Sequence, residues 1–423
     1  MNWTISTQDK KYLRELAKKQ AEYAALPIMQ KRKEMWYNLN DGKDTSRPPV
    51  IIETWTFDRD FMPPGVFKCT SEPARSIEWQ LLRNIRNHEL IDDDKVITDV
   101  FSIGWFVEID EFGGIQIKYE SVKDAEGVNL GYKWEHPIKD LKKDLNLLKP
   151  AKAVVDKKKT MEWKAFLEDL FDGILKVKIS TGTYGCAMLT HRVVSLMGME
   201  AFFTAMYDTP DEVHRLMAYL RDNCLLLMHW AEAEGLLMPN NENESSFGSS
   251  YNWTTKLPLS DYVPGKPCRL KDMWGCANSQ ETVGVSPEMF HEFCFPYYRD
   301  CCKPLGLLYY GCCEPVHPFW DDISKLPHLK KVSISKWCNE AFIADALRGT
   351  EIVYSRKPDP NFLSVDTKLN EEAWAEHIRK TLKVTKGVFT EFIVRDVYTV
   401  HDNLNNAKRA VEIARREIEH SRR

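Results

Sequence analysis

Two adjacent cysteines and a glutamate, Cys312, Cys313 and Glu314, follow an apolar run that ends at Gly311 in the stretch LLYYGCCEPV. Thiolate and carboxylate groups can hold a zinc ion, and a catalytic zinc keeps one coordination position open. Adjacent strand residues point to opposite sides, so both thiols can reach one site only if Gly311 turns the backbone. The alternative is one packing thiol beside an incidental neighbour. This strand end is therefore a candidate metal or catalytic site.

Polar groups also stand where other predicted strands end. Glu281 follows the run DMWG, and Asp396 follows FIVR. The carboxyl ends of parallel strands meet at one rim, where barrels of this type build their active sites. We therefore predict Glu281, Cys312 and Asp396 as catalytic residues, and Glu281, Cys312, Cys313 and Asp396 as metal ligands. The structural alternatives are a helix-start carboxylate for Glu281 and an ion pair with Arg395 for Asp396.

Aromatic residues at strand ends form the candidate substrate site: Trp55, Tyr184, Trp274, Tyr310 and Trp337. Core packing accounts for many aromatic residues in any chain. A cluster at one mouth would instead suit a flat aromatic ring through stacking, or a methylated cation through cation–π contact.

Strand-like runs alternate with helical segments over most of the chain. The strand candidates are RPPVIIETW, ILKVKISTGTYG, CRLKDMWGC, LGLLYYGCC, LKKVSISKW, EIVYSRKPDP and GVFTEFIVRDVYTV. This alternation predicts a parallel sheet with crossover helices. Seven candidates come close to the eight strands of a TIM (β/α)8 barrel, which is the α/β fold we predict. An open doubly wound sheet is the alternative, although no GxGxxG or Walker signature favours it.

The predicted barrel occupies residues 47–423, after an N-terminal helical extension over 1–46. Between about 95 and 135, the segment DVFSIGWFVEIDEFGGIQIKYE contains two alternating runs split by Gly113-Gly114. Two such runs around glycines predict an inserted β-hairpin. The C-terminal ARREIEHSRR has interspersed glutamates and predicts a solvated terminal helix.

Composition excludes several classes of protein. The chain has 423 residues, 43% of them hydrophobic, and a net charge of -4, so it lacks the concentrated basic character of nucleic-acid-binding proteins. It contains neither a long uncharged apolar stretch nor an N-terminal signal-peptide core, which predicts a cytoplasmic protein without membrane contact. The eleven cysteines are then expected to be free, metal-binding or catalytic rather than paired. Plain packing roles are expected for Cys186, Cys224, Cys268, Cys294 and Cys338.

Several stretches resemble one enzyme family: RPPV, LKDMWGCANSQETVGVSPEMFHEFCFPYYRD, LGLLYYGCCEPV, LPHLKKVSISKW, YSRKPDPNFL and RDVYTVHDN. Together they resemble the uroporphyrinogen-decarboxylase-like superfamily and, within it, the branch of corrinoid-dependent methyltransferases. The likeness covers about 270–420 well, 175–270 fairly and the first 170 residues weakly. The family has a TIM-barrel fold, in agreement with the alternation described above.

The resemblance implies transfer of a methyl group from a small methylated donor to the cobalamin of a separate corrinoid protein, with zinc as a cofactor. In the coenzyme-M branch, a His-x-Cys pair and a distant Cys hold the zinc. Here Tyr310 stands at the His place, Cys312 at the first Cys place and Cys313 in place of a glycine, and the distant Cys place falls near Arg395-Asp396. The aromatic set favours a methoxylated aromatic donor, with a methylated amine second.

Two other functions stay open at this point. One is a tetrapyrrole decarboxylase, although the exit of the first strand, ETWTFDRDF, lacks the Arg-rich pattern of that branch. The other is a non-catalytic barrel that binds a corrinoid or a metal. The sequence leaves open whether the protein forms a homodimer.

Overall fold

The computed structural model describes residues 3–123, 129–242 and 247–422. Its strands are β1 (Val50–Ile52), β2 (Val100–Ile103), β3 (Val107–Asp110), β4 (Lys118–Lys123), β5 (Asn129–Glu135), β6 (Lys152–Val155), β7 (Lys176–Ile179), β8 (Cys186–Ala187), β9 (Trp274–Ala277), β10 (Leu307–Tyr310), β11 (Leu329–Ile334), β12 (Val353–Arg356) and β13 (Thr390–Val394).

The α-helices are α1 (Thr7–Ala24), α2 (Pro27–Asn40), α3 (Asp58–Phe61), α4 (Glu72–Arg86), α5 (Leu141–Asp144), α6 (Lys157–Leu170), α7 (Leu189–Met197), α8 (Met199–Asp208), α9 (Pro210–Ala233), α10 (Pro287–Phe293), α11 (Phe295–Cys302), α12 (Trp320–Ile323), α13 (Glu340–Leu347), α14 (Asn361–Ser364), α15 (Glu371–Val384) and α16 (Leu404–Ser421). Short 3-10 turns that bear on the site are η1 (Trp55–Phe57), η5 (Phe247–Ser249) and η7 (Gln280–Thr282).

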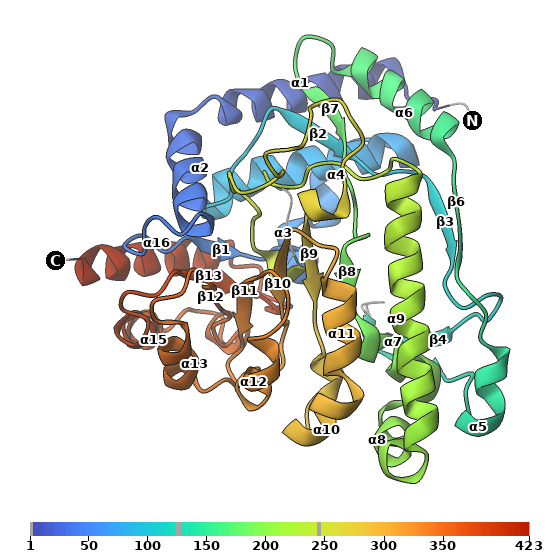
Figure 1. Ribbon diagram of the computed structural model, residues 1–423. Helices are drawn as coiled ribbons and strands as arrows, with labels where there is room; N and C mark the ends of the chain where they lie inside the picture. Colours follow the sequence, from blue (N-terminus) through green and yellow to red (C-terminus); the bar gives the residue numbers. More distant parts are fainter. Residues whose placement is uncertain (1–2, 124–128, 243–246, 423) are drawn as a thin grey trace.

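Seven strands form one parallel sheet in the order β1-β13-β12-β11-β10-β9-β8. The sheet lies at the centre of the molecule, and α9, α11, α12, α13 and α15 lie outside it (Figure 1). Helices between successive strands return the chain to the same end of the sheet, as parallel pairing requires. The predicted α/β fold with a parallel sheet and crossover helices is therefore confirmed.

The predicted closed ring of eight strands is not found among the described residues. β2 and β7 pair with each other in a separate two-stranded parallel sheet. On the free side of β1, side chains replace a neighbouring strand, because Val50 N donates to Asp94 Oδ2 and Ile52 N donates to Asp93 Oδ2, each at 2.8 Å. Carboxylates satisfy these edge N–H groups, so β1 has no ladder partner there.

The predicted hairpin around Gly113-Gly114 is wrong in its pairing. The run before these glycines contributes β3, which pairs antiparallel with β6, and the run after them contributes β4, which pairs antiparallel with β5. Residues 124–128 lie outside the described residues. The alternation of each run is typical of a strand, but it does not specify the partner, which lies 40 residues further on for β3.

Side chains on the central strands alternate between two environments. In β13, Phe392 and Val394 pack against α16 in one apolar cluster, while Ile393 belongs to another cluster with Trp36 of α2. A period of two puts Glu391 and Arg395 on the same face as Ile393. That face carries the charged residues, so the inner side of the sheet is where chemistry can be placed.

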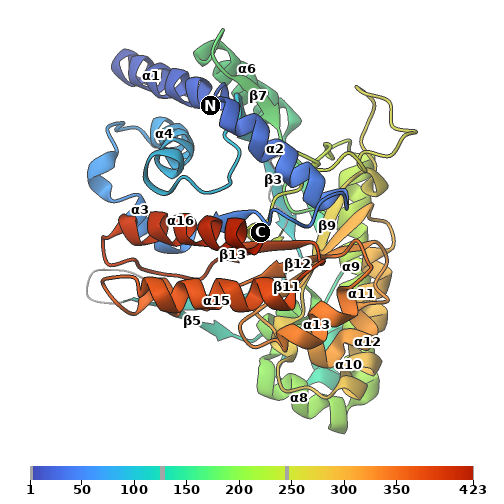
Figure 2. The same ribbon diagram turned by 90° about the vertical axis from the view of Figure 1, so that its left-hand side faces the viewer.

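The C-terminal helix α16 is less solvated than its sequence predicts. It lies beside α15 (Figure 2), where Trp374 Nε1 donates to Ala410 O at 2.9 Å. Arg415 pairs with Asp94 at 2.6 Å, which ties the helix to the edge of β1. In the part of the chain that the structure describes, no helix is both long and apolar enough to cross a membrane.

Candidate active site

The chain brings two of the three predicted catalytic residues together at the carboxyl end of the sheet. Gly311 has φ +94°, a backbone conformation that side chains rarely adopt, and after it both thiols face the same place. The sulfurs of Cys312 and Cys313 are 3.5 Å apart, and Cys313 Sγ donates to Asp396 Oδ2 at 3.1 Å. Residues 83 positions apart in the sequence thus form one cluster.

Arg395 is the centre of this cluster, which we call the rim cluster: Glu53, Cys312, Cys313, Arg395 and Asp396. Arg395 Nη1 donates to Cys312 Sγ at 3.5 Å, and Arg395 Nε lies 3.6 Å from Glu53 Oε2 and 3.3 Å from Asp396 Oδ2. Neither contact of Nε is a hydrogen bond, so this buried N–H has no partner. The guanidinium therefore retains an unused donor in a site that is closed to most solvent.

The two thiols differ in acidity. The hydrogen bond from Cys313 lowers the pKa of Cys312 most, and the charge of Arg395 lowers it further against the opposing effect of burial. The same hydrogen bond raises the pKa of Cys313, because its proton is the shared one. The pair is therefore arranged as a thiolate at Cys312 and a thiol at Cys313.

Glu53 was not among the predicted site residues, although it stands at the end of β1. Its Oε2 accepts a hydrogen bond from Ser249 Oγ, and its Oε1 accepts one from Asp396 N at 3.4 Å. Glu53 is 3% exposed, so Arg395 is the cation that balances its charge. The strand-end rule that selected Asp396 applies equally to Glu53 and would have found it.

Glu281, in η7, is turned toward a different set of partners. Its Oε2 accepts from Thr190 Oγ1 at 2.8 Å, and its Oε1 lies 3.2 Å from His191 Nδ1. Burial opposes ionisation, but the hydrogen bonds from His191 and Thr190 lower the pKa of Glu281 overall. Glu281 joins the rim cluster only at second hand, through the neighbouring Glu314.

Glu314 is a structural carboxyl group that supports the cysteine turn. It is 1% exposed, and it accepts from Cys312 N at 2.8 Å and from Ser279 N at 3.1 Å. Burial raises the pKa of Glu314. The contacts agree with the loop role that the residue's position suggests, and they fix the backbone that presents Cys312.

A pocket of about 300 Å³ opens beside the rim cluster, and we call it the rim pocket. It is lined by Glu53, Trp55, Gly182, Thr183, Gly185, Cys186, Asn240, Gly248, Ser249, Asn252, Trp274, Gly275, Cys276 and Arg395. Four glycines keep its walls low, and two tryptophans supply flat apolar surface. The volume suits a small ligand of roughly one aromatic ring.

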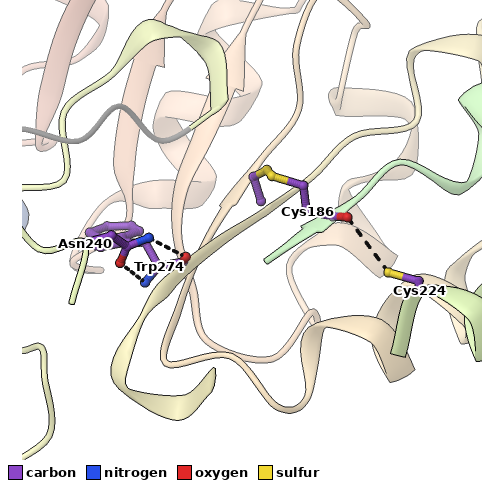
Figure 3. Close-up of a disulfide and its surroundings, with 5 residues drawn as sticks. Cys186, Cys224, Asn240 and Trp274 are labelled. Atoms are coloured by element: carbon purple, nitrogen blue, oxygen red, sulfur yellow. Dashed lines mark hydrogen bonds between the residues drawn. A yellow bond between two sulfur atoms is a disulfide. The ribbon is translucent and has the colours of Figure 1, made fainter. Parts of the chain in front are cut away.

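One wall of the rim pocket is a disulfide between Cys186 and Cys276 (Figure 3). The two cysteines are 90 residues apart and are register neighbours on β8 and β9. The expectation of an unpaired packing role for Cys186 is therefore wrong, because strand pairing supplies a partner that sequence spacing does not show. Beside the disulfide, Asn240 holds the backbone of Trp274 with bonds of 3.0 and 2.9 Å, and Cys224 Sγ lies 3.8 Å from Cys186 O.

The five predicted substrate-binding aromatics are not all in one place. Trp55 and Trp274 line the rim pocket. Tyr184 lines a separate cavity of about 230 Å³, of which Cys186 is also part. Tyr310 is fully buried with its hydroxyl 2.6 Å from Ser279 Oγ, and Trp337 is 66% exposed under Lys336 Nζ.

The predicted zinc ligands, as arranged, do not fit a zinc ion. Zinc needs three or four donors at about 2.0–2.3 Å around one point. The Arg395 guanidinium lies against Cys312 and Asp396, where a cation would have to sit, and Glu281 faces Thr190 and His191. Within residues 3–123, 129–242 and 247–422, no three His, Cys, Asp or Glu side chains are grouped to hold a metal ion.

Comparisons with known proteins bear on the fold. No protein-family model and no curated protein sequence matches the chain. Among solved structures, a methyltransferase from Methanosarcina mazei is similar, with a TM-score of 0.50 over 92% of this chain and 99% of that chain. The two sequences are 12% identical, so the likeness concerns the path of the chain. This protein shares the fold of that methyltransferase over nearly its whole length.

Proposed function

We propose that this protein is a methyltransferase that takes the methyl group from a small methylated donor bound in the rim pocket. The observation that carries the proposal is the rim cluster itself, in which a guanidinium with an unused donor adjoins an aromatic-walled pocket. The motif resemblance to corrinoid-dependent methyltransferases supports it, and so does the shared fold with a protein described as a methyltransferase. The acceptor in this proposal is the Co(I) corrinoid of a separate cytoplasmic protein.

The chain's own part in this reaction is to make the leaving group easier to expel. When the methyl carbon moves to cobalt, the cobalt electron pair forms the new bond. The pair of the broken C–O bond stays on oxygen, which then takes a proton from water. Arg395 can place positive charge beside that oxygen, and a fixed donor in a water-poor site is a large source of rate enhancement. Cys312 and Glu53 hold the guanidinium from two sides.

A methoxylated aromatic suits this pocket better than a methylated amine. A flat ring can lie against Trp274 or Trp55, while a cationic amine would meet the like charge of Arg395. The carboxylate of Glu53 is already engaged by Ser249 and Arg395, so it is not free to compensate a second cation. Zinc has no step in this proposal because the donor set does not fit it.

The test is a methyl-transfer assay with purified protein and a reduced corrinoid protein. Conversion of Co(I) to methyl-Co(III), followed by its visible absorption, is expected with a methoxylated aromatic and not with methylated amines. Uroporphyrinogen serves as the control substrate, with no release of CO2 expected. Absence of cobalt methylation with every methylated donor, or decarboxylation of uroporphyrinogen, would refute the proposal.

A further inference from the structure

Asn252 is a buried amide in the rim pocket that makes no hydrogen bond with its side chain. It is 1% exposed, yet neither its Oδ1 nor its Nδ2 has a partner. A buried polar group without a partner costs about 1–3 kcal/mol. Native proteins leave few such groups, so a side chain with both ends unpaired in a pocket wall points to a missing ligand.

The backbone that carries Asn252 is fixed on both sides. Asn40 Nδ2 donates to Tyr251 O at 3.0 Å and to Trp253 O at 2.7 Å. The carbonyl of Asn252 itself accepts from Trp274 Nε1 at 3.0 Å. The main chain is thus fully engaged while the side chain is not, and the amide is presented to the pocket by a rigid mount.

A second asparagine in the same wall shows what a structural role looks like. Asn240 also lines the rim pocket, and both ends of its amide are bonded to the backbone of Trp274. It replaces a neighbouring strand at that point of β9. Asn252 has the same side chain in the same wall and none of those bonds, which separates recognition from support.

We propose that Asn252 reads the methyl donor, and that the donor is a neutral aromatic methyl ether with a hydroxyl group on the adjacent ring carbon. An asparagine amide presents a donor and an acceptor side by side and pairs with a ligand edge that offers the complement. The ether oxygen would accept from Nδ2, and the hydroxyl would donate to Oδ1. The ring would then lie against Trp274, whose indole is anchored to the same residue.

A neutral donor follows from the charges of the lining. Arg395 and Glu53 compensate each other, and Asp396 adds a further carboxylate beside them. An anionic ligand would therefore gain little net attraction. This inference rests on the proposed function, because it names the substrate of the same pocket.

The experiment is a calorimetric titration of the full chain with two probes, 2-methoxyphenol and methoxybenzene. The wild type is expected to bind 2-methoxyphenol at least tenfold more tightly, since a site built to bond a hydroxyl discriminates strongly against the analogue without it. In Asn252→Leu, which keeps the volume and removes the amide, the preference should fall to about twofold or less while methoxybenzene binds as before. Equal affinities in the wild type, or an unchanged preference in the variant, would overturn the inference.

A matched control distinguishes recognition from folding. Asn87, at the start of the turn Asn87–Ile91, is buried with an unpartnered Oδ1 and lies outside the pocket lining. Asn87→Leu should leave the preference for 2-methoxyphenol intact. Asn252→Leu should unfold at the same temperature as the wild type or higher, because it removes an unpaired buried amide. A clear fall in that temperature would mean that Asn252 supports the fold, which would overturn the inference.

Failure of the inference and failure of the proposed function give different results. If other methylated donors transfer their methyl group to Co(I) while 2-methoxyphenol neither binds nor reacts, the reading of Asn252 is wrong and the methyltransferase stands. If 2-methoxyphenol binds through Asn252 and no donor methylates cobalt, the pocket is assigned correctly and the reaction is not.

Discussion

The chain contains two adjacent-cysteine pairs, and they differ in every chemical respect. Cys301 and Cys302 end helix α11 and are fully buried in the apolar core. Burial raises the pKa of Cys302, and a hydrogen bond with Cys224, together with burial, raises that of Cys301. Cys312 follows a strand, lies beside a guanidinium and has a lowered pKa. The dipeptide is identical, so the neighbouring charge decides which pair is reactive.

Removal of Arg395 should abolish that contrast with the largest effect. Arg395→Gln is expected to slow methyl transfer by about 10²–10³ in kcat, the usual loss when one donor to a developing oxyanion is removed. Arg395→Lys keeps the charge and should retain part of the rate. Methyl transfer to a Co(I) corrinoid measures both.

A double variant keeps this test independent of folding. Arg395→Gln alone leaves Glu53 as an unpaired buried charge, which is strongly destabilising. Arg395→Gln with Glu53→Gln removes both charges and should fold with a normal unfolding midpoint. An active double variant would contradict the role assigned to Arg395.

Replacement of one cysteine in each pair should sharpen the comparison. Cys312→Ser is expected to lower kcat roughly tenfold through misplacement of Arg395, while the donor binds as before. Cys302→Ala should leave kcat unchanged and cost about 1–2 kcal/mol of stability through lost packing. Steady-state kinetics and urea unfolding separate these results; equal kinetic effects at the two positions would refute the distinction.

Alkylation should read the acidity difference directly. Iodoacetamide at pH 7 is expected to label Cys312 in the folded protein and to spare Cys301 and Cys302, because the thiolate is the nucleophile. In Arg395→Gln, labelling of Cys312 should slow about tenfold, since an adjacent opposite charge shifts a pKa by about 1–3 units. Peptide mass spectrometry gives each rate, with urea-unfolded protein as the fully reactive control.

Stability at alkaline pH should show the smallest effect, with opposite signs for the two pairs. Cys302 has a raised folded pKa, so its contribution is present below the unfolded value of 9.0 and is lost as pH rises toward the folded value. Cys312 has a lowered folded pKa, so its contribution is present above 9.0 and is lost as pH falls through the folded value. Between pH 7 and pH 10, Cys302→Ala should reduce the alkaline loss of stability and Cys312→Ser should increase it. Loss in the same direction for both variants would contradict the assignment.

Much of the fold could be predicted from local patterns. The apolar runs before Gly311 and Arg395 are strands, and the segments between them are helices that begin at capping residues such as Asn339 and Asn370. The strand-end rule found Cys312 and Asp396, because parallel strands carry their carboxyl ends to one rim. Glu281 obeys the same rule, yet its side chain turns to Thr190 and His191. The rule gives the rim and not the direction of each side chain.

Pairing partners could not be predicted, because period-two alternation states that a strand has two faces and not which strand lies beside it. For this reason the hairpin at Gly113-Gly114 was misassigned and the Cys186–Cys276 disulfide was missed. The residue types themselves determined that thiols, carboxylates and aromatics would stand at strand ends. Only the tertiary structure decided that a guanidinium, rather than a metal, lies between Cys312 and Asp396, and that Asn252 faces the pocket unbonded. Hydrogen bonds and charges act over a few ångströms, and those distances exist only after residues far apart in the sequence have packed together.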